Sequence, residues 1–253
     1  MTLSHDVAGD GPAVLLVHSG VGDRRMWHPQ WQPLIDAGYR VIAPDLRGYG
    51  DTPFPTAPYR HVDDLVALLD ELDVDNTAVV GASLGGKVGL QLAALHPVRV
   101  DSLALLDAAP VDRPDSEALT AFDEREDALL EAGDINAAVA LNLATWLGPE
   151  ADAATAERVG AMQRHVFELL LAAVADETGV AQRPVEADLT AVTARTLAVA
   201  GAHDLPDFRE FAAALPDLLS DANHRELSWA GHLPSLERPE EVTGLLLEFL
   251  AGR

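Results

Sequence analysis

The sequence predicts an α/β protein with one mostly parallel sheet of about seven to eight strands, helices on both faces and an inserted all-helical segment. The first observation is that short, continuous apolar runs alternate with helix-length segments through most of the chain. The second is that residues 110–190 break this alternation, because they contain helical patterns and no convincing strand.

Six apolar runs form the predicted sheet. They are AVLLVH (13–18), RVIAP (40–44), TAVVGA (77–82), SLALLD (102–107), TLAVAG (196–201) and the weaker HRELSW (224–229). Four helices are expected around them, at 61–72, 84–95, 208–215 and 239–250. In the first of these, the apolar residues recur at the spacing of a helix with one buried face.

The interrupting segment contains three helical stretches, at roughly 115–132, 134–147 and 151–176, separated by Gly133 and by Gly148-Pro149. A helical insertion between parallel strands predicts a cap over the carboxyl edge of the sheet, where such sheets hold their ligands. We therefore expect a core domain of residues 1–109 and 191–253 and a helical cap of residues 110–190. The alternative is a separate packing unit with no part in a site.

Composition excludes several classes of function. The 253 residues include 17 Lys plus Arg and 41 Asp plus Glu, a formal charge of −24, so we expect neither a nucleic-acid nor an anionic-membrane partner. Without cysteine there can be no disulfide, thiolate metal site or cysteine nucleophile. The first apolar run is too short for a signal peptide or an anchor, and we expect a cytoplasmic protein.

The strongest local pattern is Gly81-Ala82-Ser83-Leu84-Gly85-Gly86, which lies between a predicted strand and a predicted helix. A G-x-S-x-G turn needs small neighbours because the serine adopts a strained backbone conformation at a sharp corner. The pattern therefore predicts a nucleophile at Ser83.

A serine nucleophile requires a histidine base and an acid that orients this base. Asp204 follows one predicted strand and His232 the next, in the order serine, acid, histidine. Asp107 also ends a strand and could supply the carboxylate instead. No H-x-H or H-E-x-x-H spacing occurs, so we expect no metal and no cofactor.

Acyl transfer also requires donors for the tetrahedral oxyanion. The N–H of Leu84, directly after the nucleophile, is one candidate. The other should come from the loop His18-Ser19-Gly20-Val21-Gly22, and we assign it to Gly20 with Val21 as the alternative. His18 itself is expected to be a structural hydrogen-bonding residue.

With these segments in order, the chain resembles the α/β-hydrolase fold family. The resemblance covers nearly the whole chain, through HSGVG, DLRGYGDT (45–52), GASLGG, GAHD (201–204) and GHLPSLERPEEV (231–242). It implies that Ser83, Asp204 and His232 form the catalytic triad, and that residues 110–190 are the cap that shapes the substrate pocket.

The chain departs from this family pattern at two places. Ser19 stands where the family usually has glycine. In addition, about a dozen residues precede the first predicted strand, too few for the usual N-terminal pair, so we expect about seven strands.

The resemblance also bears on the substrate. The stretch HSGVGDRRMW is similar to a loop of 3-oxoadipate enol-lactonases, in which case Arg24 or Arg25 could pair with a substrate carboxylate. Trp27 and Trp146 are candidate walls of the pocket, although core packing explains either equally well.

The sequence thus predicts a cofactor-independent serine hydrolase, a monomer or homodimer acting on a small carboxylic ester, lactone or thioester. One alternative keeps the triad but cleaves carbon–carbon bonds, or acts as a perhydrolase or cofactor-free oxygenase. A second alternative is a small-molecule receptor with a vestigial triad.

Overall fold

The computed structural model describes residues 3–111, 113–175 and 182–252. Its centre is a seven-stranded sheet in the order β1-β3-β2-β4-β5-β6-β7. Every neighbouring pair of strands is parallel except β1 and β3, which are antiparallel. The predicted fold class and the expected strand number are both confirmed.

The strands lie close to the predicted runs. They are β1 (His5–Ala8), β2 (Ala13–Val17), β3 (Arg40–Pro44), β4 (Thr77–Ala82), β5 (Val100–Leu106), β6 (Arg195–Gly201) and β7 (Ala222–Leu227). The sequence pattern did not predict β1, which has four half-buried or exposed residues and lies at the edge of the sheet. Without a continuous apolar run, such a strand gives no signal that distinguishes it from a loop.

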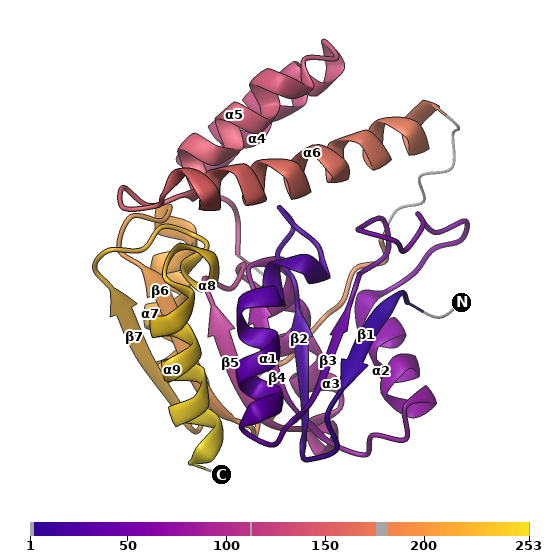
Figure 1. Cartoon of the computed structure of the whole chain (residues 1–253), viewed down its shortest axis with the longest axis vertical. Coiled ribbons are helices and arrows are strands. Elements are labelled where there is room, and N and C mark those ends of the chain that lie inside the picture. Colours follow the sequence, from indigo (N-terminus) through magenta and orange to yellow (C-terminus); the bar gives the residue numbers. More distant parts are fainter. Residues whose placement is uncertain (1–2, 112, 176–181, 253) are drawn as a thin grey trace.

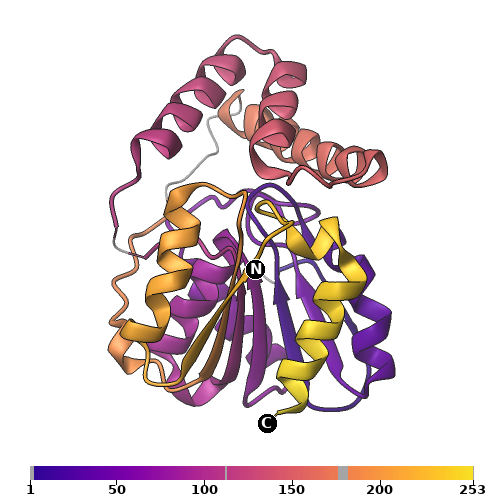
Figure 2. The same cartoon turned by 90° about the vertical axis from the view of Figure 1, so that its left-hand side faces the viewer.

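Helices cover both faces of the sheet (Figures 1 and 2). One face carries α1 (His28–Asp36) and α9 (Pro239–Ala251), with the single turn α8 (Pro234–Glu237) beside them. The other face carries α2 (His61–Glu71), α3 (Leu84–Leu95) and α7 (Pro206–Leu218). Short 3-10 turns lie at Arg24–Trp27, Pro97–Arg99 and Leu189–Ala191.

The sequence analysis missed α1. This helix has Pro29 in its first turn and Pro33 in its interior, and proline in the interior of a helix removes a backbone hydrogen bond. It is stabilised by its surroundings instead. Leu34 is fully buried, and the side-chain amide of Gln30 donates to the carbonyl of Ser235, 205 residues further along the chain.

Alternate residues of the central strands enter two separate cores. In β2, Leu15 and Val17 pack on the side of α2, α3 and α7, whereas Val14 and Leu16 pack on the side of α1 and α9. Side chains on a strand point to opposite faces in turn, so a strand buried on both sides is apolar throughout. The alternation of buried contacts explains why the strand sequences are continuous apolar runs.

The interrupting segment is helical, as expected. It contains α4 (Glu117–Glu131), α5 (Ile135–Trp146) and α6 (Ala153–Ala175), which lie beyond the end of the sheet where β5 finishes (Figures 1 and 2). They share a small apolar cluster of their own, formed by Leu130, Ala138, Val139 and Phe167. The predicted cap of residues 110–190 contains residues 112 and 176–181, and the predicted helix of residues 151–176 ends among them. These residues lie outside the described part of the chain.

The longest helix, α6, has 23 residues. Within the described part of the chain, no helix combines the length and the apolar character needed to cross a membrane.

The position of Trp27 generates a test of the core. Its side chain is fully buried in the cluster shared with α1 and α9, so Trp27→Ala should lower the free energy of unfolding by about 3–5 kcal/mol. Urea denaturation measures this loss. Val98→Ala is the control, because Val98 is 83% exposed and its truncation should change stability by less than about 0.5 kcal/mol. Equal effects of the two substitutions would contradict the assignment of Trp27 to the core.

Candidate active site

Four polar side chains gather at one edge of the sheet because of the strand order. Ser83 follows β4, Asp107 follows β5, Asp204 lies shortly after β6, and His232 lies in the loop after β7. These four strands are adjacent and parallel, so their carboxyl ends lie side by side. The topology thus brings together residues that are up to 149 positions apart in the sequence.

Ser83 occupies a strained turn between β4 and α3. Its φ is +49°, a region that residues other than glycine rarely adopt, and its side chain is mostly buried. Two hydrogen bonds to the segment around the end of β5 hold this backbone. The Ser83 N–H donates to the carbonyl of Leu106 at 2.9 Å, and the Ser83 carbonyl accepts from Ala109 at 3.0 Å.

Glycine is required on both sides of this turn because the backbones approach closely. A Cβ atom at Gly81 would lie 2.4 Å from the carbonyl oxygen of Gly85, and one at Gly85 would lie 2.2 Å from the carbonyl oxygen of Val17. The G-x-S-x-G pattern therefore has a direct steric origin.

Asp204 and His232 form a buried hydrogen-bonded pair. The Nδ1 atom of His232 lies 2.6 Å from Oδ2 of Asp204, and the other carboxylate oxygen accepts from the N–H of Leu205 at 2.7 Å. An ionised carboxylate only accepts hydrogen bonds, so the proton of a neutral His232 lies on Nδ1. Its Nε2 atom is then the basic nitrogen.

Asp107, the alternative acid, lies behind this pair. It is fully buried with φ +48°, and its Oδ1 atom accepts from the N–H of Gly201 at 2.7 Å. Burial and the adjacent carboxylate of Asp204 raise the pKa of Asp107 well above its ordinary value. The Oδ2 atom of Asp107 has no hydrogen-bond partner among the described residues, and Asp204 is the carboxylate that contacts His232.

A metal ion could in principle use the same three residues. Asp107, Asp204 and His232 offer ligand atoms within 4.8 Å of one another. The direct bond between His232 and Asp204 already uses one atom of each, as a histidine and its orienting acid require.

The loop after β2 contains Gly20 and Val21, the two residues considered for the second oxyanion donor. A Cβ atom built on Gly20 would lie 3.8 Å from the side chain of Leu84, so this loop faces the start of α3. The N–H of Val21 already donates to Oγ of Ser19 at 3.1 Å. This contact gives Ser19 a role in shaping the loop and favours Gly20 over Val21 as the donor. Leu84 begins α3, where backbone N–H groups have no partner within the helix.

His18 is satisfied by the backbone and is not placed to act as a base. Its Nδ1 atom lies 2.8 Å from the carbonyl of Ser19, and its Nε2 atom accepts from the N–H of Leu46 at 2.9 Å. Burial lowers the pKa of His18. Both ring nitrogens are occupied, which agrees with the structural role expected from the sequence.

Aromatic rings surround His232. Trp146, at the end of α5, and Phe208, in α7, have ring centroids 4.6 Å and 4.3 Å from its imidazole. Phe122 of α4 packs on Trp146 at 4.7 Å. The sequence analysis had missed Phe208 and Phe122; the position of Phe208, four residues after Asp204, was an available signal. Trp27 is fully buried in the core, and we do not include it in the substrate pocket.

Glu237 joins the loop of His232 to the connection between α5 and α6. Its carboxylate accepts from the backbone N–H groups of Gly231, Leu233 and Gly148, at 3.0 to 3.3 Å. The N–H of His232 also donates to the carbonyl of Trp146 at 2.8 Å. The helical insertion is therefore bonded directly to the loop that carries His232. No sequence pattern singled out this glutamate.

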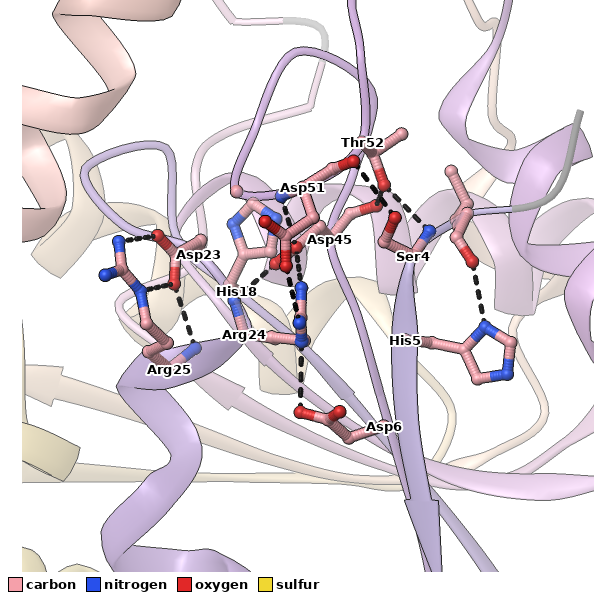
Figure 3. A network of polar contacts seen from close by, with 12 residues as sticks. Ser4, His5, Asp6, His18, Asp23, Arg24, Arg25, Asp45, Asp51 and Thr52 are labelled. Carbon is pink, nitrogen blue, oxygen red and sulfur yellow. Dashed lines mark hydrogen bonds and ion pairs between the residues drawn. The ribbon is translucent and has the colours of Figure 1, made fainter.

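The two arginines considered as partners of a substrate carboxylate already pair with aspartates of this protein. Figure 3 shows Arg24 among Asp6, Asp45 and Asp51, with Arg25 beside Asp23. Burial alone would lower the pKa of Arg24, but the hydrogen bond with Asp51 and the charge of Asp45 raise it. Both guanidinium groups are thus neutralised, and we do not assign them to substrate binding.

Comparison with known proteins identifies the family. A family model described as the alpha/beta hydrolase fold matches residues 12–239. This chain belongs to the α/β-hydrolase fold family. The resemblance inferred from the sequence motifs is confirmed.

Relatives within the family are named hydrolases. The chain is 36% identical to a protein of Variovorax paradoxus (strain S110) named as the carbamate hydrolase RutD, over 99% of this chain and 97% of that protein. Among solved structures, an esterase from Thermogutta terrifontis is 29% identical with a TM-score of 0.81, over 99% of this chain and 93% of the other. An enol-lactonase from Burkholderia xenovorans LB400 is 25% identical with a TM-score of 0.81, over 98% and 96%. The protein is a hydrolase of the α/β fold.

The raised pKa of Asp107 generates a stability test. Below its ordinary pKa near 3.8, this carboxyl holds a proton in both states, whereas at higher pH only the unfolded chain ionises. Its contribution to stability therefore falls as pH rises. Asparagine cannot ionise, so Asp107→Asn should gain stability relative to the wild type from about pH 4 upward, by at most about 1.4 kcal/mol per pH unit.

Urea denaturation of both proteins across this range measures the difference. Asp101→Asn, at an exposed position of β5, measures the effect of removing one negative charge alone. A stability difference for Asp107→Asn that decreases as pH rises would contradict the protonated state.

Proposed function

We propose that the protein is a serine hydrolase that cleaves a small ester, lactone or thioester through an acyl-enzyme on Ser83. The observation that carries this proposal is the 2.6 Å bond between His232 and Asp204, at the sheet edge where Ser83 occupies its strained turn. The relative named as a carbamate hydrolase extends the substrate class to carbamates, whose carbonyl reacts by the same route.

The reaction begins when Oγ of Ser83 attacks the substrate carbonyl. His232 accepts the hydroxyl proton on Nε2, while Asp204 holds the imidazole in the required tautomer. The backbone N–H groups of Leu84 and Gly20 stabilise the tetrahedral oxyanion. Its collapse breaks the bond to the leaving group, which takes the proton from His232, and an acyl ester remains on Ser83.

Water completes the cycle. His232 removes a proton from a water molecule, which attacks the acyl ester and forms a second tetrahedral intermediate. Collapse releases the carboxylic acid, and the proton returns to Oγ of Ser83. No step requires a metal or a cofactor.

The helical insertion completes the proposed site. Trp146 of α5 lies against His232, and Phe122 of α4 lies against Trp146. These contacts support residues 110–190 as a cap that forms the apolar roof of the substrate pocket, over a core of 1–109 and 191–253. We keep the further expectations of a small-molecule substrate, a monomer or homodimer and a cytoplasmic location.

The first test is covalent labelling. A fluorophosphonate should add once to the wild-type protein, through Ser83, and intact-protein mass should show no adduct on Ser83→Ala. Hydrolysis of a short-chain p-nitrophenyl ester should be lost in the same variant, with the circular dichroism spectrum unchanged. Ester turnover by Ser83→Ala would overturn the assignment, whereas a silent ester panel with activity on a diketone or peroxide would favour the alternative chemistries.

The orienting acid provides a second test. Asp204→Asn keeps the shape of the side chain but removes the charge that holds His232 in its tautomer, so kcat should fall by about 1,000-fold or more. Steady-state kinetics on the p-nitrophenyl ester measure this loss. Unchanged kcat in Asp204→Asn would show that another carboxylate, such as Asp107, orients the base.

A further inference from the structure

The inner face of α4 carries one charged residue within an apolar stripe. Its half-buried or buried positions are Leu119, Phe122, Glu126, Leu129 and Leu130. Phe122 and Glu126 are four residues apart, so they lie on the same side of the helix, toward the site. A half-buried carboxylate on such a face is unfavourable unless other groups compensate for its lost hydration.

One hydrogen bond links Glu126 to the side chains that pack around His232. One carboxylate oxygen accepts from the side-chain amide of Asn142, which is almost fully buried. The oxygen of that amide accepts from Nε1 of Trp146 at 2.9 Å, and Trp146 packs on His232. A chain of direct contacts therefore connects Glu126 to the imidazole.

Tyr49 lies beside Gly20 and is affected by the charge of Glu126. Its hydroxyl lies 3.7 Å from the position of a Cβ atom on Gly20, beside the proposed oxyanion loop. The charge of Glu126 contributes, after burial and Tyr59, to raising the pKa of Tyr49 to about 12. Glu126 is thus connected to His232 through side-chain contacts, and its charge acts on Tyr49, which lies beside the oxyanion loop.

No cation among the described residues pairs with Glu126, whose pKa is raised by burial. Among the ion pairs of the described residues, none includes Glu126. Its one hydrogen-bond donor, Asn142, is uncharged. Arg24 and Arg25 are bound to other carboxylates. The net charge of −24 adds a long-range field of the same sign.

We propose that Glu126 selects substrates by charge, favouring an ester, thioester or carbamate with a cationic ammonium group and disfavouring one with a carboxylate. This inference rests on the proposed serine hydrolase function and adds the substrate class. For a cation under α4, attraction to Glu126 offsets part of the free energy lost when its hydration is removed. A carboxylate there would be repelled by the like charge. Glu126 is a specificity-determining residue and takes no part in bond breaking.

Three thioacetates that differ in one charge test this directly. They are acetylthiocholine (cationic), S-(3,3-dimethylbutyl) thioacetate (its neutral isostere) and S-(2-carboxyethyl) thioacetate (anionic). Each transfers the same acetyl group and releases a thiol that Ellman's reagent detects. The chain contains no cysteine, so the protein contributes no background.

The decisive variant is Glu126→Gln, whose side-chain oxygen can still accept from Asn142. Relative to the neutral thioester, kcat/KM should fall about 10-fold for the cationic substrate and rise about 10-fold for the anionic one. The ratio between the two charged substrates should therefore change by about 100-fold. Glu124→Gln, at an exposed position of α4, removes the same charge and should leave all three values within about two-fold of wild type.

The outcomes separate the two proposals. An unchanged ratio in Glu126→Gln, with wild-type turnover of the neutral thioester that Ser83→Ala lacks, would overturn the charge selection alone. Equal shifts in Glu126→Gln and Glu124→Gln would also overturn it, because net charge would then explain the effect. Absence of turnover on all three thioesters, together with no fluorophosphonate adduct, would overturn both proposals.

Discussion

The close approach of β4 and α3 is the constraint on which the site depends. Ser83 adopts φ +49° because the chain turns from strand to helix without a connecting loop, and neighbouring backbone leaves no space for a Cβ atom at Gly81 or Gly85. The same turn is hydrogen-bonded to the end of β5, where Asp107 is also in the left-handed region. The backbone is therefore strained at two adjacent strand ends, and packing of the surrounding buried sheet keeps it in this conformation.

Much of this arrangement was predictable from local sequence. The buried strands are continuous apolar runs, and a parallel sheet places their carboxyl ends at one edge, so Ser83, Asp204 and His232 could be expected to converge. Strand β1 and helix α1 were missed because edge pairing and distant contacts stabilise them. Glu126 and Glu237 were missed for a related reason, since single polar contacts between separate elements leave no periodic signal.

Two clusters of acids in this protein are stabilised in different ways. Arginines neutralise the carboxylates around Arg24, but the three acids around His232 have different partners. The pKa of Asp107 is raised by burial, Asp204 contacts the imidazole, and Glu237 accepts from backbone N–H groups. Backbone N–H groups and the imidazole therefore stabilise these three acids.

The contact between Gly148 and Glu237 bears on how substrate range could be exchanged between relatives. A graft cut at the two ends of the insertion would exchange everything between them, including the connection between α5 and α6. Here the connection between α5 and α6 supplies one of the N–H groups that Glu237 binds, and a Cβ atom at Gly148 would lie 2.4 Å from that carboxylate. A chimera that replaced the helices but kept this junction would preserve the loop of His232. One that also replaced this connection would alter the loop of His232 while appearing to change only specificity.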